Sequence, residues 1–170
     1  RDNHLIAVDL TNPDLIVSVE KQIPRGSLHV FRSKFLWEGR CYEKYRIRNF
    51  YLDPLEFTIY LAIASDFSDI FEVRGMRRQA RGERRELLIR EYLMEIPYVG
   101  LDGILRRTRI EFSRKPEAIE PGKAVFSLYL KRQEEVEFEV VVSCIEGGKA
   151  EHEQAASFAH AYHASARLFR

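Results

Sequence analysis

Several features that mark whole classes of protein are scarce in this sequence. Only two of its 170 residues are cysteines, Cys41 and Cys144, whereas small scaffolds held by disulfides carry more. We therefore expect two reduced thiols, and this expectation favours a cytoplasmic location. The longest apolar runs are far shorter than the roughly 18 residues that a membrane helix needs. No secretory signal is visible either, so nothing here indicates a membrane or a secreted protein.

An excess of charge of one sign is lacking as well. The 27 Lys and Arg residues nearly balance the 26 Asp and Glu residues, and the formal net charge is +1. Such a balance argues against a globally basic nucleic-acid-binding protein. The chain contains no Gly-rich phosphate loop, no G-x-S-x-G elbow and no paired C-x-x-C motif, so it lacks these common signatures of catalytic and nucleotide-binding sites.

Histidines are few, and their spacing does not build a metal site. His160 and His163 are three residues apart near the C-terminus, and His152 lies upstream of them. These side chains could hold a metal ion only with further ligands. We expect neither a metal site nor a cofactor.

Alternation of apolar and polar residues is what the sequence does have. A hydrophobic content of 45% and a charged content of 31% suit a folded domain, and the length fits a single one. In Leu55–Ile63 every second residue is large and apolar, which is the period of a strand with one buried face. Glu135–Ser143 alternates in the same way. Further strands are expected in Gly26–Trp37, Arg40–Phe50, Gly103–Phe112 and Lys123–Lys131.

Short strands separated by Pro, Gly and Asp turns predict an all-β fold, an antiparallel β-sandwich. Glu38-Gly39 is placed for a tight hairpin between the first two long strands. The free energy gained by burying the apolar residues of one strand does not offset the conformational entropy lost when its backbone is ordered, so one sheet in water is not stable by itself. A second sheet must therefore cover Leu55–Ile63, and the strand with Val136–Val142 is the candidate.

The last twenty residues have a different pattern. Glu151–Arg170 lacks Gly and Pro, is rich in Ala, and follows Gly147-Gly148. Its apolar residues recur at helical spacing, and the expected stripe is Phe158, Ala159, Tyr162 and Ala166. We expect a β-sandwich over residues 1–150 and a linker helix over residues 151–170 that leads to a further domain.

The segment Ala64–Arg85 combines three carboxylates, Asp66, Asp69 and Glu72, with six arginines. On an extended chain, residues three apart lie roughly 10 Å apart along the strand, which suits a glycosidase carboxylate pair poorly. We favour acids that cap turns and pair with nearby arginines.

The arginines of Arg74–Arg85 have several possible roles. Nucleic-acid binding would use such a patch on phosphates, but aromatic residues for base stacking are missing from it. We favour a solvated hairpin whose arginines meet Glu86, Glu91 and Glu95, or a surface that docks an acidic neighbouring domain. Glycines within the segment weaken a helix, and we expect a long β-hairpin-like excursion over Met76–Ile96.

Trp37 is the only tryptophan. Together with Phe35, Tyr42 and Tyr45 it could form a platform on which sugars stack. Aromatic residues in a sandwich more often pack in the core or at its rim, and we favour that interpretation.

Four ordered blocks resemble one known family. They are Ala7–Leu15, Ile23–Phe50, Ser65–Gly82 and Tyr98–Phe112. Together they resemble the N-terminal domain of bacterial and archaeal glycogen debranching enzymes of the amylo-α-1,6-glucosidase type. The most specific block is DF-x-DIFEVRG, from Asp66 to Gly75, and LTNPD and GLDG support it in the expected order.

The resemblance implies a large, supersandwich-like domain that precedes an (α/α)₆ toroid, where the glucosidase carboxylates reside. On this basis the domain is not catalytic, and no residue here is carried over as catalytic. It supports the catalytic domain of the same parent chain and contributes to an α-glucan cleft. The candidate substrate-binding residues are Trp37, Asp66, Asp69, Glu72 and Arg74.

The resemblance also implies that the chain is a piece of a longer protein. It opens at Arg1 without an initiator Met, and members of the family carry further strands upstream. The sandwich would then lack one or two strands, with a sheet edge left open. Two alternatives stay open for the function: a stand-alone carbohydrate-binding module that uses Trp37, and an anion- or nucleic-acid-binding β domain that uses Arg74–Arg85.

Overall fold

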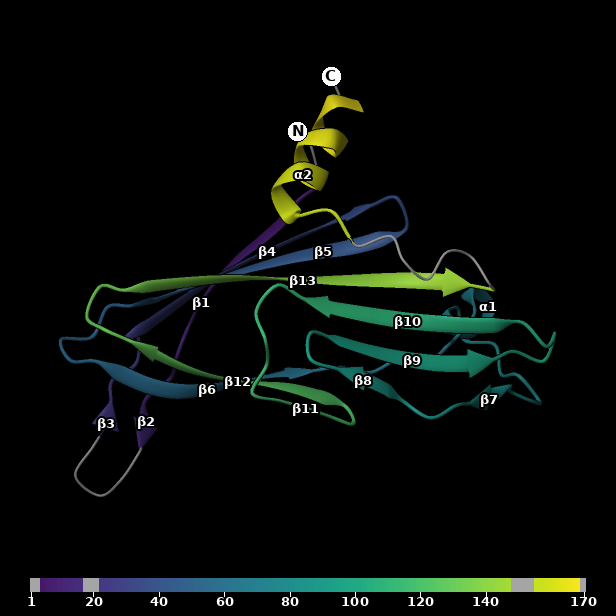
Figure 1. Ribbon diagram of the computed structural model, residues 1–170, viewed down its shortest axis with the longest axis horizontal. Helices are drawn as coiled ribbons and strands as arrows, with labels where there is room; N and C mark the ends of the chain where they lie inside the picture. Colours follow the sequence, from purple (N-terminus) through teal and green to yellow (C-terminus); the bar gives the residue numbers. More distant parts are fainter. Residues whose placement is uncertain (1–3, 17–21, 148–154, 169–170) are drawn as a thin grey trace.

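A computed structural model describes residues 4–16, 22–147 and 155–168 of the chain. Strands dominate it, and the helices are short (Figure 1). The strands are β1 (Ile6–Thr11), β2 (Leu15–Ile16), β3 (Gln22–Ile23), β4 (Leu28–Trp37), β5 (Arg40–Asn49), β6 (Leu55–Ala62), β7 (Glu83–Arg84), β8 (Leu88–Arg90), β9 (Leu93–Val99), β10 (Leu105–Phe112), β11 (Ala118–Glu120), β12 (Lys123–Leu130) and β13 (Glu135–Glu146). The helices are α1 (Ile70–Val73) and α2 (Phe158–Leu168).

Two antiparallel sheets make the sandwich. The large sheet has the order β1-β4-β5-β13-β10-β9-β7, with β8 also paired to β9, and the small sheet has the order β11-β12-β6. A separate two-stranded ribbon joins β2 and β3. Every described strand pair is antiparallel, so the predicted all-β antiparallel sandwich is confirmed.

The β4–β5 hairpin forms at the predicted turn. Glu38 and Gly39 both have positive φ, at 47° and 72°, which is the backbone of a type I′ turn. Glycine adopts this conformation without steric cost. Trp37 pairs with Arg40 directly beside the turn, and the register continues to Leu28 and Asn49.

The main core lies between the two sheets. Phe126 of β12 packs on Phe138 of β13 with ring centroids 4.8 Å apart, and it meets the edge of Phe112 of β10 at 5.8 Å. The alternating apolar residues of β6 pack against the same cluster. The prediction that the strand containing Val136–Val142 covers β6 is therefore confirmed.

Helix α2 lies within the segment where a helix was predicted, although residues 148–154 and 169–170 are outside the described part of the chain. It packs on the outer face of the large sheet, where it forms a second cluster. Ala161 is buried there while Ala159 is exposed. The predicted apolar stripe was therefore wrong at Ala159, because the face of the helix that meets the sheet contains Ala161 and not Ala159.

The favoured interpretation, in which the aromatic residues around Trp37 pack in the core or at its rim, is confirmed, and these residues form no single surface. Phe35 and Tyr42 are buried under α2, with their rings stacked 5.2 Å apart. Tyr45 points to the other side of the sheet and lies in the main core. Trp37 is half-buried and packs against the cluster under α2. Alternate residues of a strand face opposite sides, which separates Tyr45 from Tyr42.

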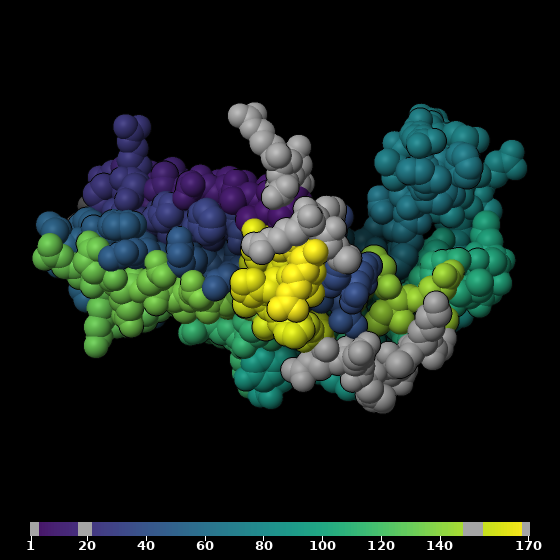
Figure 2. All heavy atoms as spheres, turned by 90° about the horizontal axis from the view of Figure 1, so that it is seen from above, coloured from purple at the N-terminus to yellow at the C-terminus, as the bar shows by residue number. Residues whose placement is uncertain are grey.

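The predicted hairpin-like excursion over Met76–Ile96 is confirmed only from Glu83 onward. Strand β8 pairs with β9 through the turn at Glu91 and Tyr92, and β7 continues the pairing with β9 as far as Val99. Residues 76–82 form no helix or strand. Helix α1, which was not predicted, precedes them. The segment Ser65–Arg85, hereafter the lobe, stands out from the body of the molecule (Figure 2, dark teal).

The small sheet covers only part of the large one. Strand β6 ends the small sheet on one side, and three apolar residues of β1, Ile6, Val8 and Leu10, are exposed. A cavity of about 560 Å³ lies between β6 and the inner face of the large sheet. It stays a prediction that further strands upstream of this sequence complete the sandwich at this edge.

Two further findings concern features expected from the sequence. Cys41 and Cys144 are both free, as predicted. None of the helices in the described ranges is long and apolar enough to cross a membrane.

Candidate functional site

The candidate site is an open cavity of about 780 Å³ at one end of the large sheet. Its first wall is the chain from Ser65 to Asp69, which leaves β6 and enters the lobe. Its second wall is formed by the β9–β10 turn and the adjoining ends of β10 and β13. The site therefore joins the most specific block of the family resemblance to the block that contains GLDG.

A capping box orders the start of the lobe. Asp69 is the N-cap of α1, and its Oδ1 accepts hydrogen bonds from the backbone N–H groups of Phe71, at 2.8 Å, and Glu72, at 2.9 Å. The backbone N–H of Asp69 donates in return to Oε2 of Glu72, at 3.2 Å. Three otherwise unpaired backbone N–H groups at the helix start are thus satisfied, and Asp69 and Glu72 satisfy each other's reciprocally. The helix ends at Val73 with Arg74 as its C-cap, and Gly75 follows with a φ of 94°.

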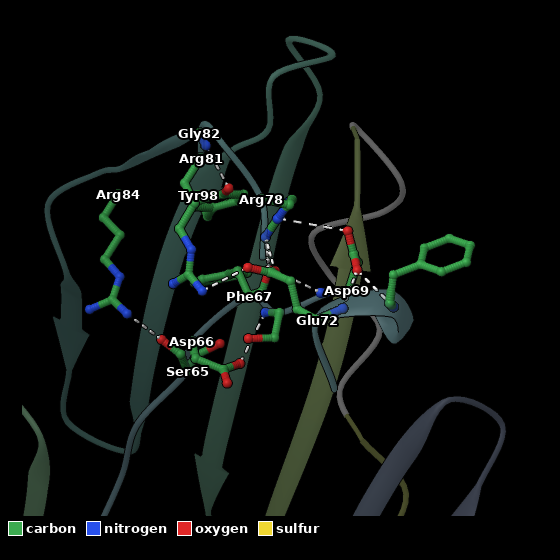
Figure 3. Close-up of polar contacts among 12 residues, drawn as sticks. Ser65, Asp66, Phe67, Asp69, Glu72, Arg78, Arg81, Gly82, Arg84 and Tyr98 are labelled. Carbon is green, nitrogen blue, oxygen red and sulfur yellow. Dashed lines mark hydrogen bonds and ion pairs between the residues drawn. The ribbon is translucent and has the colours of Figure 1, made fainter. Parts of the chain in front are cut away.

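Glu72 also holds the returning chain. Its carboxylate is only 7% exposed and forms ion pairs with Arg78 and, at 2.7 Å, with Arg81 (Figure 3). Hydrogen bonding from Arg78 is the main cause that lowers the pKa of Glu72 below its ordinary value. The predicted role of these acids as caps and arginine partners is confirmed for Asp69 and Glu72.

The lobe is anchored on β9 through Tyr98. The ring of Phe67 stacks on Tyr98 with centroids 4.5 Å apart, and Phe67 has a φ of 51°. The backbone N–H of Gly82 donates to the Tyr98 hydroxyl at 2.7 Å. Arg78 and Arg84 donate to the carbonyl oxygens of Phe67, at 3.0 Å, and Ser65, at 2.9 Å. Both ends of the lobe are thereby tied to the same strand (Figure 3).

Asp66 lies on the cavity wall and is exposed. Its Oδ1 accepts a hydrogen bond from the backbone N–H of Ser68 at 3.0 Å. That hydrogen bond is the main reason why the pKa of Asp66 is lowered. Asp66 is therefore an ionised acceptor that faces the solvent of the cavity.

The opposite wall carries a second ion-pair network. Arg106 holds both carboxylate oxygens of Asp102, at 3.0 and 2.8 Å, and reaches Glu146 at 2.9 Å. Its hydrogen bonds lower the pKa of Asp102 to about 2. Arg106 and Glu146 lie opposite each other in the register of β10 and β13, so the sheet itself aligns this pair.

These carboxylates are ill suited to proton donation. A glycosidase needs a general acid whose pKa is raised, paired with a second carboxylate. At this site the pKa shifts of Asp66, Glu72 and Asp102 are all downward. The cavity instead offers ionised acceptors and arginine donors, which can hydrogen-bond to hydroxyl groups.

The candidate residues are divided between several places. Asp66 and Asp69 line the cavity, the side chain of Glu72 is buried inside the lobe, and Arg74 is exposed at the end of α1. Trp37 packs at the α2 cluster and does not line the cavity. Among the described residues, no group of three or more His, Cys, Asp and Glu side chains could hold a metal ion. His152 lies outside those residues.

The prediction that the arginines of this segment pair with Glu91 and Glu95 was wrong. Arg78 and Arg81 pair with Glu72, and Arg85 pairs with Glu83. Two of the expected partners pair with other residues, Glu91 with Lys115 and Glu95 with Arg109. The reason is the turn of the chain after α1, which brings the arginines back over α1 and not along β8.

Sequence reasoning missed the second wall of the cavity. Asp102 stood within the GLDG block, but it was read only as a family marker. Nothing local to Arg106 or Glu146 indicates their contact, because they are 40 positions apart and only strand register brings them together.

A family model described as the N-terminal domain of (some) glycogen debranching enzymes matches residues 1–141. A search of curated proteins finds no match. Among solved structures, a protein provisionally named as a kojibiose phosphorylase from the human microbiome is similar, with a TM-score of 0.57 at 10% identity over 96% of this chain and 21% of that one. A polysaccharide lyase reaches a TM-score of 0.46 at 10% identity over 85% of this chain and 25% of that one. The likeness to the phosphorylase is one of fold, and the chain spans about a fifth of that protein's length.

Proposed function

Because the chain belongs to the family of N-terminal domains of glycogen debranching enzymes, we propose that it is a non-catalytic domain of a glycoside hydrolase. In this proposal it supports an (α/α)₆ catalytic domain of the same parent chain. The cavity beside the lobe contributes to the cleft in which that enzyme binds an α-glucan.

The family match over residues 1–141 is the observation that carries the proposal, and the surroundings of the carboxylates agree with it. Asp66, Glu72 and Asp102 are held in the ionised form by hydrogen bonds and arginines. A carboxylate that stays ionised near neutral pH cannot protonate a leaving glycosidic oxygen. It can accept hydrogen bonds from sugar hydroxyls, which suits a wall of a binding cleft.

The first test is the release of glucose from a branched α-glucan. We expect the 170-residue chain to release none, while the parent enzyme does. Removing residues 1–150 from the parent enzyme should lower the thermal stability of its catalytic domain and its turnover. Clear turnover by the chain alone would contradict the proposal.

The contribution to the cleft is tested in the parent enzyme through Asp66. Asp66→Asn should raise KM several-fold with little change in kcat, because it removes binding shared by ground and transition states. Asp53→Asn is the matched control, since Asp53 is also exposed but lies in the turn before β6. An unchanged KM for both variants would remove Asp66 from the cleft.

The two alternatives have less support. A stand-alone carbohydrate-binding module would need an exposed aromatic platform, but Phe35 and Tyr42 are buried beside Trp37. An anion- or nucleic-acid-binding surface would need free arginines. Four of the six arginines in Arg74–Arg85, however, already form ion pairs or hydrogen bonds with other residues of the chain. These four are Arg78, Arg81, Arg84 and Arg85.

A further inference from the structure

The outer side of the lobe is unusually apolar. Ile70, Phe71, Val73 and Met76 are between 55% and 72% exposed and lie within one short stretch of chain at α1. We call these four residues the apolar tip. Single exposed apolar residues are common, whereas adjacent ones on a protrusion mark a surface that is covered by something else. The lobe that carries the tip projects from the sandwich (Figure 2).

The tip is held in place by contacts within the lobe, although its side chains are exposed. The Asp69–Glu72 capping box orders α1, and Glu72 joins it to Arg78 and Arg81. Phe67 fixes the base of the lobe on Tyr98. A surface that is already ordered loses little conformational entropy when it binds, and this favours association.

The charge beside the tip indicates what kind of surface covers it. Arg74 and Arg77 flank Met76 and are both exposed. Neither forms an ion pair within the part of the chain that the structure describes. A second copy of the chain would bring the same cations to the contact, and like charges across an interface oppose binding. An apolar recess bordered by Asp or Glu side chains would match both features.

We propose that the apolar tip docks this domain on the catalytic domain of its parent enzyme, in an apolar recess bordered by carboxylates. This inference rests on the function proposed above and assigns the contact surface to Ile70, Phe71, Val73 and Met76, with Arg74 and Arg77 at its border. Asp66 and Asp69 immediately precede the tip and line the cavity. Docking here therefore brings the cavity to the boundary between the domains, where ligand sites commonly form.

Hydrogen exchange of the α1 amides tests the contact directly. We expect exchange over residues 70–76 to be at least tenfold slower in the full-length parent enzyme than in the 170-residue chain. In the parent enzyme, the double variant Phe71→Ser/Val73→Ser should lose this protection. The matched control is Leu36→Ser/Leu52→Ser, which removes two apolar residues that are equally exposed but lie outside the lobe.

A second variant separates docking from any effect on the fold of the lobe. Arg74→Glu/Arg77→Glu leaves the apolar tip intact and reverses only the charge at its border, so it should also speed exchange of the α1 amides in the parent enzyme. Equal exchange rates in the wild-type enzyme and in the chain alone would overturn the proposal.

Other occupants of the tip give distinct results. If the 170-residue chain dimerises in a concentration-dependent way and Phe71→Ser/Val73→Ser abolishes this, the tip binds a second copy of the chain and the docking proposal is wrong. Retarded migration in glycogen gels that the same variant abolishes would replace it with a glucan. If deleting residues 1–150 leaves the catalytic domain unaffected, the proposed function itself fails. If that deletion lowers stability and turnover but the tip variants leave hydrogen exchange of the α1 amides unchanged, only the assigned docking surface is wrong.

Discussion

Glu72 shows what a single carboxylate contributes to the lobe. It closes the capping box with Asp69 and pairs with Arg78 and Arg81, so that one side chain joins the helix to the chain that returns from it. These contacts join residues up to nine positions apart, so they link parts of the lobe that no regular helix or strand connects.

We expect Glu72→Gln to lower the melting temperature of the chain at pH 7. The pKa of Glu72 is lowered from 4.5 in the folded chain, so its contribution to stability is complete above 4.5. That contribution is lost as the pH falls through the lower, folded pKa. Melting curves of both proteins from pH 7 downward should therefore converge in acid. Glu83→Gln is the control, because Glu83 and its partner Arg85 are both exposed and such pairs contribute little. A difference that is equally large in acid would contradict this role of the charge.

Gly82 is required for the lobe to approach β9. A Cβ at this position would lie 2.0 Å from the carbonyl oxygen of Val99 and 2.9 Å from Cζ of Tyr98. We expect Gly82→Ala to reduce the free energy of unfolding by about 1–3 kcal/mol, the usual cost of overpacking. Urea denaturation measures it, with Gln79→Ala in the exposed part of the lobe as the control. Equal stability of the two variants would show that the lobe can move away from β9.

At the scale of elements, α2 is held on the large sheet by a small contact. Phe158 and Tyr162 meet the ring of Phe35 at 4.9 and 5.6 Å, and the small side chain of Ala161 lets the helix approach. Trp37 packs at the same cluster, so its fluorescence reports on whether the helix is in place.

We expect Ala161→Glu to detach α2, because a carboxylate buried against aromatic rings has no partner there. Trp37 would then become more exposed and its emission would move to longer wavelength. Ala159→Glu places the same side chain on the exposed face of the helix and should leave the emission unchanged. Identical spectra for both variants would argue against the packing of α2.

At the scale of the whole molecule, the two sheets are joined by aromatic rings. Phe126 is 1% exposed and meets both Phe112 and Phe138 of the opposite sheet. The small sheet has few strands, and Phe126 is one of the buried residues through which it packs on the large sheet.

We expect Phe126→Ala to lower the free energy of unfolding by about 3–5 kcal/mol, the usual cost of such a cavity. Tyr129→Ala on the same strand removes an exposed ring and should change it by no more than about 0.5 kcal/mol. Urea denaturation followed by circular dichroism compares the two. A small loss for Phe126→Ala would mean that the sheets are held together elsewhere.

The sequence by itself determined the long strands, their antiparallel arrangement and the presence of the C-terminal helix. These features follow from local periods, as in Leu55–Ile63, and from turn residues such as Glu38-Gly39, which act over a few positions. Capping by Asp69 was also predictable, since its partners are at most three residues away.

Only the tertiary structure decided where the lobe turns, which face of α2 meets the sheet, and what forms the cavity. Arg106 and Glu146 become neighbours through the register of β10 and β13, and Phe67 reaches Tyr98 only after the chain has left β6. Contacts of this kind depend on how strands far apart in the chain align, and no local period of the sequence encodes that alignment.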